Sequence, residues 1–356
     1  MRPTSPPRRS RLADGREILY FDDSPGRRGE PTPDARELPV RDAPSELRHD
    51  PLVDEWVIIA THRQDRTYLP SASDCPLCPS RGTTHTEVPD SGYDVVVFEN
   101  RFPSLPATAP AETLAGRCEV VCYDSDHAGS FASLSAARLR TVGEAWAQRT
   151  AELSRDPRVA HVFVFENRGA EIGVTLDHPH GQVYAYPFLP PTIERMLSAA
   201  RAHHATHASC LACDLLADEV ADGRRIVAET EHAIAYVPLA ARWPFEVHAV
   251  PRRHVPDLAG LADAERDGVV ALEADILARL DGLFNGRTPY LAGWLQAPTG
   301  DGRDLFHLRL QMISPQRARG RLKHLAGSET IAGAFINDVR PEDAAERLRQ
   351  ANGRDR

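Results

Sequence analysis

The segment His178-Pro179-His180-Gly181-Gln182 holds the densest set of chemically active side chains in the sequence. Side chains two residues apart lie on one face of an extended strand, so His178, His180 and Gln182 share a face. Pro179 removes a backbone donor, and Gly181 allows the backbone to approach a ligand closely. Two imidazoles and an amide on one face are poorly suited to a hydrophobic core, but they suit a metal site beside a phosphate-binding site.

The pair Cys75 and Cys78, separated by two residues, is typical of metal ligation. Zinc takes four ligands, so this pair needs two imidazoles or carboxylates from elsewhere. His127 and His178 stand at the ends of expected strands and would complete the set. A Cys-x-x-Cys loop without metal is the alternative. A thioredoxin-like redox motif fits less well, because no strand-to-helix unit surrounds the cysteines.

With His178 assigned to the metal, His180 is free for covalent catalysis. A neutral imidazole can attack phosphorus, and the resulting phosphoramidate can pass a nucleotidyl group to a second phosphate. This splits one difficult displacement into two easier steps. Gln182 suits an anionic substrate because its amide can donate to a phosphoryl oxygen, which a carboxylate would repel.

The elements that must position these residues occur twice along the chain. Each half is expected to contain a Cys-x-x-Cys pair, two strands, a helix and a further strand. The first half has strands at 95–98, 119–123 and 162–165 and a helix near 139–153, with Ser133 or Ser135 as N-cap. The second half has strands at 233–237, 246–250 and 308–313 and a helix at 263–281. This order predicts an α+β fold with a mainly antiparallel sheet and helices packed on it.

We expect four segments along the chain. Residues 1–45 are rich in Pro, Arg, Asp and Gly and should be largely flexible, apart from a short strand at 18–21. Residues 46–195 form the catalytic first half. Residues 196–348 form the second half, with a degenerate active site, and residues 349–356 form a polar tail.

Charge and hydropathy exclude several classes of protein. The 356 residues carry a formal net charge of −9, whereas a non-specific nucleic-acid binder would have a basic excess. No apolar run reaches the roughly 18 residues of a membrane span, and the N-terminus lacks the apolar core of a secretory signal. Six cysteines are too few for a disulfide scaffold. We therefore expect a cytoplasmic protein that binds neither nucleic acid nor membrane.

Taken together, these motifs resemble those of the galactose-1-phosphate uridylyltransferases, the transferase branch of the histidine-triad superfamily. The resemblance runs from about Asp50 to Leu348 and implies two duplicated histidine-triad-like halves. It also rests on the segments 50–57 (Asp-Pro-Leu-Val-Asp-Glu-Trp-Val), 61–66 (Thr-His-Arg-Gln-Asp-Arg), 97–102 (Val-Phe-Glu-Asn-Arg-Phe), 165–169 (Phe-Glu-Asn-Arg-Gly), 230–234 (Thr-Glu-His-Ala-Ile) and 242–246 (Arg-Trp-Pro-Phe-Glu).

The resemblance implies a ping-pong reaction of galactose metabolism, the Leloir pathway. UDP-glucose and galactose 1-phosphate would give UDP-galactose and glucose 1-phosphate through a uridylyl-His180 intermediate. It also implies a homodimer and one Zn²⁺ per chain, bound by Cys75, Cys78, His127 and His178. Residues matched to nucleotide and phosphate positions are Arg63, Arg66, Asn100, Asn167, Thr175 and Gln182, and those matched to hexose positions are Lys323 and Glu329.

The second half departs from the family pattern. Better-known members carry a second metal held by a Glu and three His, and this site should be absent here. The corresponding places hold Met196, Leu295, Arg309 and Gln311. Gln311 is taken as the counterpart of the nucleophile, so the second half should be non-catalytic. Ser328 and Phe335 stand where the family often has polar groups near the hexose, which bears on the choice of sugar.

A different second metal site is an open alternative. Cys210, Cys213 and His254 repeat the first cysteine–histidine set, but Arg309 is expected at the place of the fourth ligand. A second zinc in this half would then be completed by His307.

Four other functions can be weighed against the transferase. A nucleotide phosphorylase shares the His-x-His-x-Gln arrangement but accepts inorganic phosphate, and a histidine-triad hydrolase has a third His where Gln182 stands. A zinc nucleobase deaminase needs His-x-Glu before its cysteines, whereas His85-Thr-Glu87 follows Cys78. A non-catalytic zinc module would leave His180 without a role.

Overall fold

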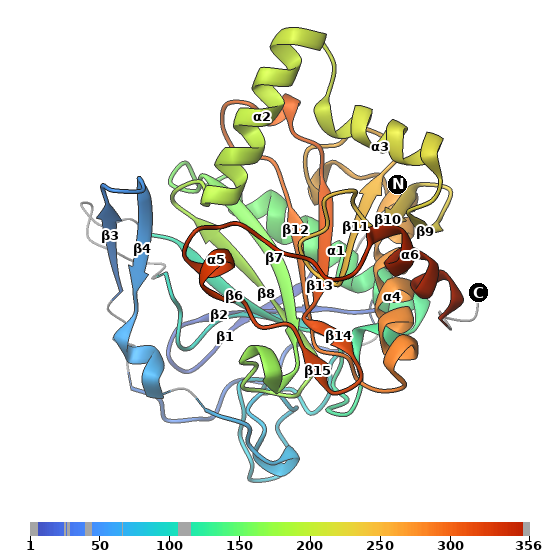
Figure 1. Cartoon of the computed structure of the whole chain (residues 1–356). Coiled ribbons are helices and arrows are strands. Elements are labelled where there is room, and N and C mark those ends of the chain that lie inside the picture. The colour runs from blue at the N-terminus through green and yellow to red at the C-terminus, as the bar shows by residue number, and fades with distance from the viewer. Residues whose placement is uncertain are drawn as a thin grey trace.

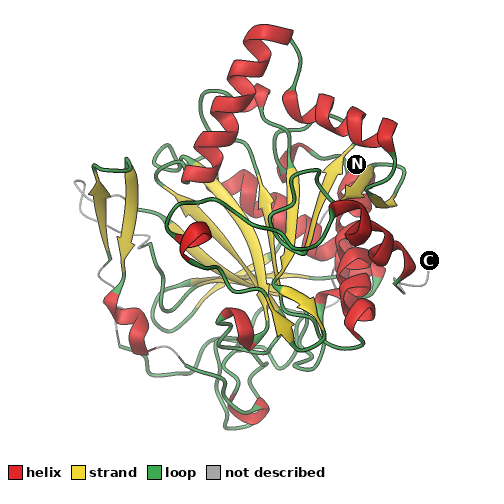
Figure 2. Cartoon of the chain, viewed as in Figure 1, coloured by secondary structure: helices red, strands yellow, loops and turns green. Residues whose placement is uncertain are grey.

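The structure is a computed structural model that describes residues 6–24, 26, 29–39, 45–65, 67–105 and 115–351. One eleven-stranded sheet forms its centre, and helices cover it (Figures 1 and 2). The strands are β1 (Arg8–Arg11), β2 (Glu17–Phe21), β3 (Glu46–Asp50), β4 (Glu55–Ile59), β5 (Val95–Glu99), β6 (Arg117–Cys122), β7 (His161–Arg168), β8 (His180–Tyr186), β9 (Ile226–Glu229), β10 (Ala233–Tyr236), β11 (Phe245–Pro251), β12 (Tyr290–Leu295), β13 (Arg309–Ser314), β14 (Gln316–Ala318) and β15 (Arg321–Leu322). The α-helices are α1 (Ala136–Leu153), α2 (Pro191–His207), α3 (Leu211–Asp222), α4 (Asp263–Phe284), α5 (Gly327–Thr330) and α6 (Pro341–Gln350).

The strand order displays the duplication. The sheet runs β1-β2-β5-β6-β8-β7-β12-β13-β11-β10-β9, and the order β5-β6-β8-β7 is mirrored by β12-β13-β11-β10. The two halves meet where β7 pairs with β12, and every pairing in the sheet is antiparallel. The predicted α+β fold with a mainly antiparallel sheet is therefore confirmed.

The structure shows which residues of the two halves correspond, and the spacing of the motifs alone did not reveal this. His178 lies two residues before β8, and His307 lies two residues before β13. Arg309 is therefore the counterpart of His180, and Gln311 is the counterpart of Gln182. The prediction that placed Arg309 at the fourth-ligand position was wrong by two residues, because it took the interval after His254 as 55 residues, whereas the interval from His254 to His307 is 53.

The core lies between one face of the sheet and the paired helices α1 and α4. Helix α1 begins after Ser135, whose side chain accepts a hydrogen bond from the backbone N–H of Arg138, so the predicted N-cap is confirmed. Trp146 of α1 packs in this core with Trp294 of β12. Val183 of β8 also points to the helices, and strand alternation therefore directs His180 and Gln182 to the opposite face.

The N-terminal segment is more ordered than the sequence predicts. Strands β1 and β2 join the edge of the main sheet, where Ile18 pairs with Phe98 of β5. Ile18, Leu19 and Tyr20 are each 1% exposed. The expected strand at 18–21 is confirmed as part of β2, but the expectation that the rest of the segment is largely flexible is wrong for β1, because two flanking strands extend a sheet whose β5 edge would otherwise be unpaired.

Two further features lie outside the predicted elements. The hairpin β3–β4 stands apart from the main sheet, and helices α2 and α3 pack against each other beyond one end of the strands (Figure 1). No helix within the described part of the chain is long and apolar enough to cross a membrane.

Candidate active site

Strand β8 presents His180 and Gln182 to two adjoining cavities on the sheet face opposite α1 and α4. Both cavities are lined by Arg63, which follows β4, and by Thr175, which lies in the loop before β8. The predicted substrate residues that line at least one cavity are Arg63, Asn100, Asn167, Thr175 and Gln182. The structure thus brings together side chains from segments more than 100 residues apart. Arg66 lies outside the described residues.

A single hydrogen bond determines which ring nitrogen of His180 carries the proton. Nδ1 lies 2.7 Å from the carbonyl oxygen of His178, and a carbonyl can only accept. Nδ1 therefore carries the proton, and Nε2 keeps its lone pair. Burial lowers the pKa of His180 below its ordinary value of 6.5, which favours the neutral ring.

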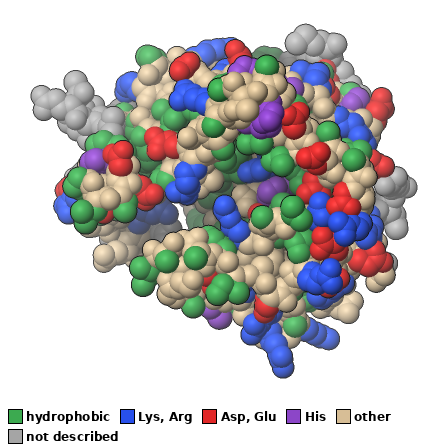
Figure 3. All heavy atoms as spheres, turned by 45° about the horizontal axis from the view of Figure 1, so that its top comes forward, with side chains coloured by type: hydrophobic (Ala, Val, Ile, Leu, Met, Phe, Trp, Pro, Cys, Tyr) green, Lys and Arg blue, Asp and Glu red, His purple; other side chains and the backbone are tan. Residues whose placement is uncertain are grey.

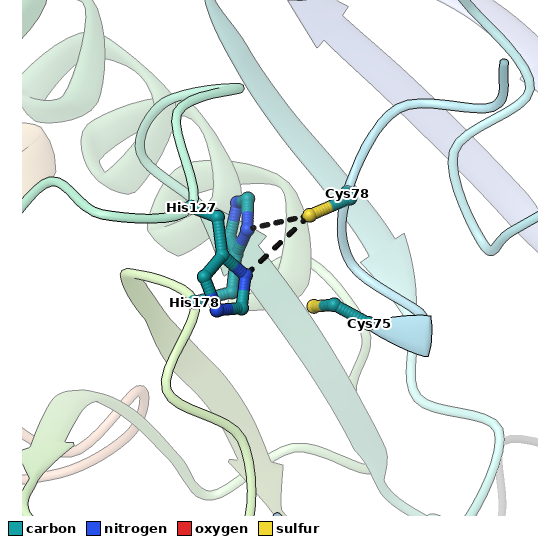
Figure 4. A group of neighbouring side chains, drawn as sticks. All are labelled: Cys75, Cys78, His127 and His178. Carbon is teal, nitrogen blue, oxygen red and sulfur yellow. Dashed lines mark hydrogen bonds between the residues drawn. The ribbon is translucent and has the colours of Figure 1, made fainter. Parts of the chain in front are cut away.

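The first cysteine–histidine cluster has the geometry of a tetrahedral zinc site. One ligand atom from each of Cys75, Cys78, His127 and His178 lies within 4.8 Å of the others, and the four side chains converge (Figure 4). Zn–S and Zn–N bonds of about 2.3 and 2.1 Å place S and N about 3.6 Å apart. Sγ of Cys78 lies 3.5 Å from Nδ1 of His127 and 3.6 Å from Nδ1 of His178.

A second cluster with the same donor set lies in the C-terminal half. Cys210, Cys213, His254 and His307 also meet within 4.8 Å. Sγ of Cys213 lies 3.5 Å from Nδ1 of His254 and 3.4 Å from Nδ1 of His307. The fourth position is therefore occupied by His307 and not by Arg309. Both clusters suit zinc, because two thiolates with two imidazoles are a common zinc donor set.

Two of the matched polar residues shape the cavity through hydrogen bonds. Arg63 donates from Nη1 to the carbonyl oxygen of Phe102 at 2.9 Å and to Oγ of Ser104 at 2.7 Å. Asn100 accepts from the backbone N–H of Phe102 at 2.8 Å. The Arg63 bonds hold the 100–104 loop against the 61–65 segment, and so they fix one wall of the cavity.

The cavity also has an apolar wall, which the sequence patterns did not predict. Phe98, Phe102, Val120 and Leu176 line it beside the polar groups. An apolar run such as 95–98 is typical of a buried strand, so pattern alone did not separate Phe98 from the core. The only available signal was that Phe98 and Phe102 belong to a segment that matches the family.

The predicted hexose residues lie elsewhere in the chain. Lys323 and Glu329 form a buried ion pair with Nζ and Oε1 2.6 Å apart, and Lys323 also donates to the carbonyl oxygens of Arg242 and Ile336. Neither residue is among the described residues that line the two cavities around His180.

Gly181 serves packing and not ligand approach. A Cβ at this position would lie 1.9 Å from Oη of Tyr123 and 2.9 Å from the carbonyl oxygen of Phe165. Both groups lie on the helix side of β8, away from His180. The expectation that Gly181 admits a ligand is therefore wrong: the glycine makes room for Tyr123.

Comparison with known proteins supports the arrangement of two linked halves. Residues 37–190 match the N-terminal domain model of galactose-1-phosphate uridyl transferase, and residues 197–354 match its C-terminal domain model. The chain belongs to this family. A galactose-1-phosphate uridylyltransferase from Streptomyces lividans is 46% identical over 96% of each chain. One from Thermotoga maritima is 40% identical over 86% of this chain and 98% of its own.

Solved structures of the family share this fold. A structure described as that of a uridylyltransferase superposes with a TM-score of 0.75 at 29% identity. The superposition covers 85% of this chain and 97% of that structure. The two family models meet between residues 190 and 197, and β7 and β12 pair on either side of this junction.

Proposed function

We propose that this enzyme transfers UMP between UDP-glucose and hexose 1-phosphates, with galactose 1-phosphate as the preferred acceptor. Nε2 of His180 attacks the α-phosphorus of UDP-glucose, forms an N–P bond and releases glucose 1-phosphate. The phosphate of galactose 1-phosphate then attacks the same phosphorus, breaks the N–P bond and leaves as UDP-galactose. The observation that carries this proposal is the hydrogen bond from Nδ1 of His180 to the His178 carbonyl, because it leaves Nε2 unprotonated inside the polar cavity.

The neighbouring groups support charge development at the transferred phosphate. The amide of Gln182 shares the face of His180 and can donate to a phosphoryl oxygen. Arg63 lines the same cavities and brings a fixed positive charge. Away from the site the surface carries interspersed acidic and basic side chains on the face seen in Figure 3. Recognition of the nucleotide therefore relies on a few placed groups.

The experiment is a two-stage labelling assay. We expect the enzyme, incubated with UDP-glucose labelled in the uridine, to retain an acid-labile uridylyl group on protein. His180→Ala should abolish this adduct, whereas His85→Ala, at an exposed histidine, should leave it intact. Transfer of the label to galactose 1-phosphate and not to inorganic phosphate separates the transferase from a phosphorylase. An adduct on the His180→Ala protein would refute the assignment.

We propose that zinc is the resident metal and that both clusters bind it, which gives two ions per chain instead of the one expected from the sequence. The donor atoms and their separations support this. Bound at the first cluster, zinc would hold the ring of His178 and so the entrance to β8. At the second cluster it would play the same structural part for β13, where Arg309 replaces a nucleophile.

We propose that the active form is a homodimer. The hairpin β3–β4 exposes apolar side chains: Leu52 is 93% exposed, Val53 61%, Val57 47% and Trp56 41%. Such a surface is typical of an interface. A second copy would also provide hexose-binding groups that one chain keeps away from its own His180. Sedimentation of Trp56→Asp should give a monomer with impaired transfer.

A further inference from the structure

Tyr93 lies in the loop before β5, and its hydroxyl contacts two separate parts of the first cysteine–histidine cluster. Oη lies 3.0 Å from the carbonyl oxygen of Leu77, which stands between the two cysteines. It also lies 2.8 Å from Nε2 of His178. Tyr93 and His178 are each 1% exposed, so water does not compete for these bonds. One hydroxyl thus joins the cysteine loop to a histidine 100 residues away.

The chemistry of the partners determines the direction of each bond. The Leu77 carbonyl can only accept, so the one hydroxyl proton of Tyr93 goes to it. Oη must then accept from His178, which places a proton on Nε2. The carbonyl oxygen of Asp124, 2.8 Å from the same nitrogen, accepts as well. Nδ1 of His178 is left with its lone pair facing Sγ of Cys78, as a metal ligand requires.

The same histidine is linked to the nucleophile. The backbone carbonyl of His178 accepts from Nδ1 of His180, and this bond leaves Nε2 of His180 unprotonated. The ring that Tyr93 contacts and the carbonyl that accepts from His180 belong to the same residue, so a displacement of His178 as a whole would move both. The order of contacts therefore runs from Tyr93 through His178 to His180.

We propose that Tyr93 is a positioning residue that, together with the Asp124 carbonyl, holds the tautomer and ring orientation of His178 for the metal and, through the backbone carbonyl of His178, the orientation of His180. The part of this inference that concerns His180 rests on the proposed function, whereas the part that concerns the metal does not. The second cluster offers an internal comparison: within the described chain no side chain bonds Nε2 of His307, which faces the backbone of Pro251 and Arg253.

The test is Tyr93→Phe, which keeps the ring and removes Oη. Its control is Tyr123→Phe, because Tyr123 is equally buried and its Oη has no hydrogen-bond partner in the described part of the chain. Release of zinc from the intact enzyme to a chromogenic chelator is followed over time. The kinetic phase of release that is missing in Cys213→Ser is assigned to the second cluster. Uridylylation by UDP-glucose is measured on the same samples.

We expect Tyr93→Phe to release zinc from the first cluster about 10- to 100-fold faster, as is usual when a partner of a metal-bound histidine is lost. The second cluster should release at the wild-type rate, and the rate of uridylylation should fall at least about tenfold with little change in KM. Wild-type release from the first cluster would overturn the proposal. Faster release with unchanged uridylylation would overturn the link to His180. A wild-type enzyme that forms no adduct would instead refute the proposed function, while the release rates still test Tyr93.

Discussion

Hydrogen bonds around single residues decide how this site can work. The carbonyl of His178 fixes the proton of His180 on Nδ1, and no sequence pattern could assign that proton. Gly181, one residue away, points to the other face of the sheet and contacts the core. Adjacent residues of β8 therefore belong to two different environments, one chemical and one structural, as the alternation of a strand requires.

At this scale we predict that Gly181→Ala destabilises the fold and slows uridylylation. The added methyl group would overlap Oη of Tyr123, and overpacking of this kind costs about 1–3 kcal/mol. β8 would have to move, and with it the neighbouring His180. Urea unfolding and the rate of adduct formation measure the two effects.

The second variant Tyr123→Phe, made in the Gly181→Ala background, removes the atom that clashes. It should restore part of both the stability and the rate. If the double variant is no better than Gly181→Ala, then the contact with Tyr123 is not the reason for the glycine.

At the scale of elements, the helix α4 and the strands β7 and β12 bury a group of acidic side chains behind β8. Glu166 of β7 accepts from the hydroxyl of Tyr290 of β12 at 2.6 Å, and it pairs across the strands with Gly181. Glu273 of α4 is 1% exposed and faces the same region. Burial raises the pKa of Glu166 to about 7, against the weaker opposing effects of Tyr290 and Arg168, and it also raises the pKa of Glu273.

We therefore predict that the free energy of unfolding falls as the pH rises through this range. The unfolded chain releases the Glu166 proton near pH 4.5 and the folded chain near 7, so between them the folded state binds more protons. Stability from this group is greatest below about pH 4.5 and is lost by about pH 7, with a ceiling of about 3 kcal/mol. Urea midpoints at about pH 5.5 and about 8.5 measure it.

Glu166→Gln is the matched variant, because it keeps the shape and cannot ionise. It should lose most of this pH dependence, and the remainder should come from Glu273 and from the other titrating groups. The same pH dependence in both proteins would show that the carboxyl of Glu166 is not buried in its neutral form.

At the scale of the whole molecule, two halves with one architecture differ in the residue that stands at the position of His180. Each half holds a Cys-x-x-Cys pair and two histidines at corresponding places in its strands. The residue that follows the last ligand by two positions is His180 in one half and Arg309 in the other. An arginine is always protonated and has no lone pair for attack on phosphorus, so of these two residues only His180 can be the nucleophile that we propose.

We predict that the two clusters respond differently to removal of a ligand. Cys75→Ser should lose one of two zinc ions and nearly all uridylylation, because the metal holds His178. Cys213→Ser should also lose one ion and stability, but it should keep most of its activity per folded molecule. Metal analysis, thermal unfolding and the labelling assay measure these outcomes. Equal loss of activity in both variants would contradict a purely structural second cluster.

Much of the site follows from local sequence patterns. The shared face of His178, His180 and Gln182 depends only on the two-residue period of a strand, and the Cys-x-x-Cys spacing is also local. The capped helix α1 and the continuous apolar strands could be predicted for the same reason. These features need no knowledge of the rest of the chain, because the backbone geometry of a few residues determines them.

Other features depended on contacts between distant segments. The pairing of His307 with the second cysteine pair required the strand register, since the loops of the two halves differ in length. The role of Gly181 required Tyr123 on the neighbouring strand, and the link from Leu77 to His178 required the fold around Tyr93. Lys323 matches a hexose residue in sequence, yet in the fold it forms an ion pair with Glu329 and does not line the two cavities described around His180. Sequence patterns indicate which face of an element a side chain occupies, whereas long-range packing decides which residues of other elements that side chain contacts.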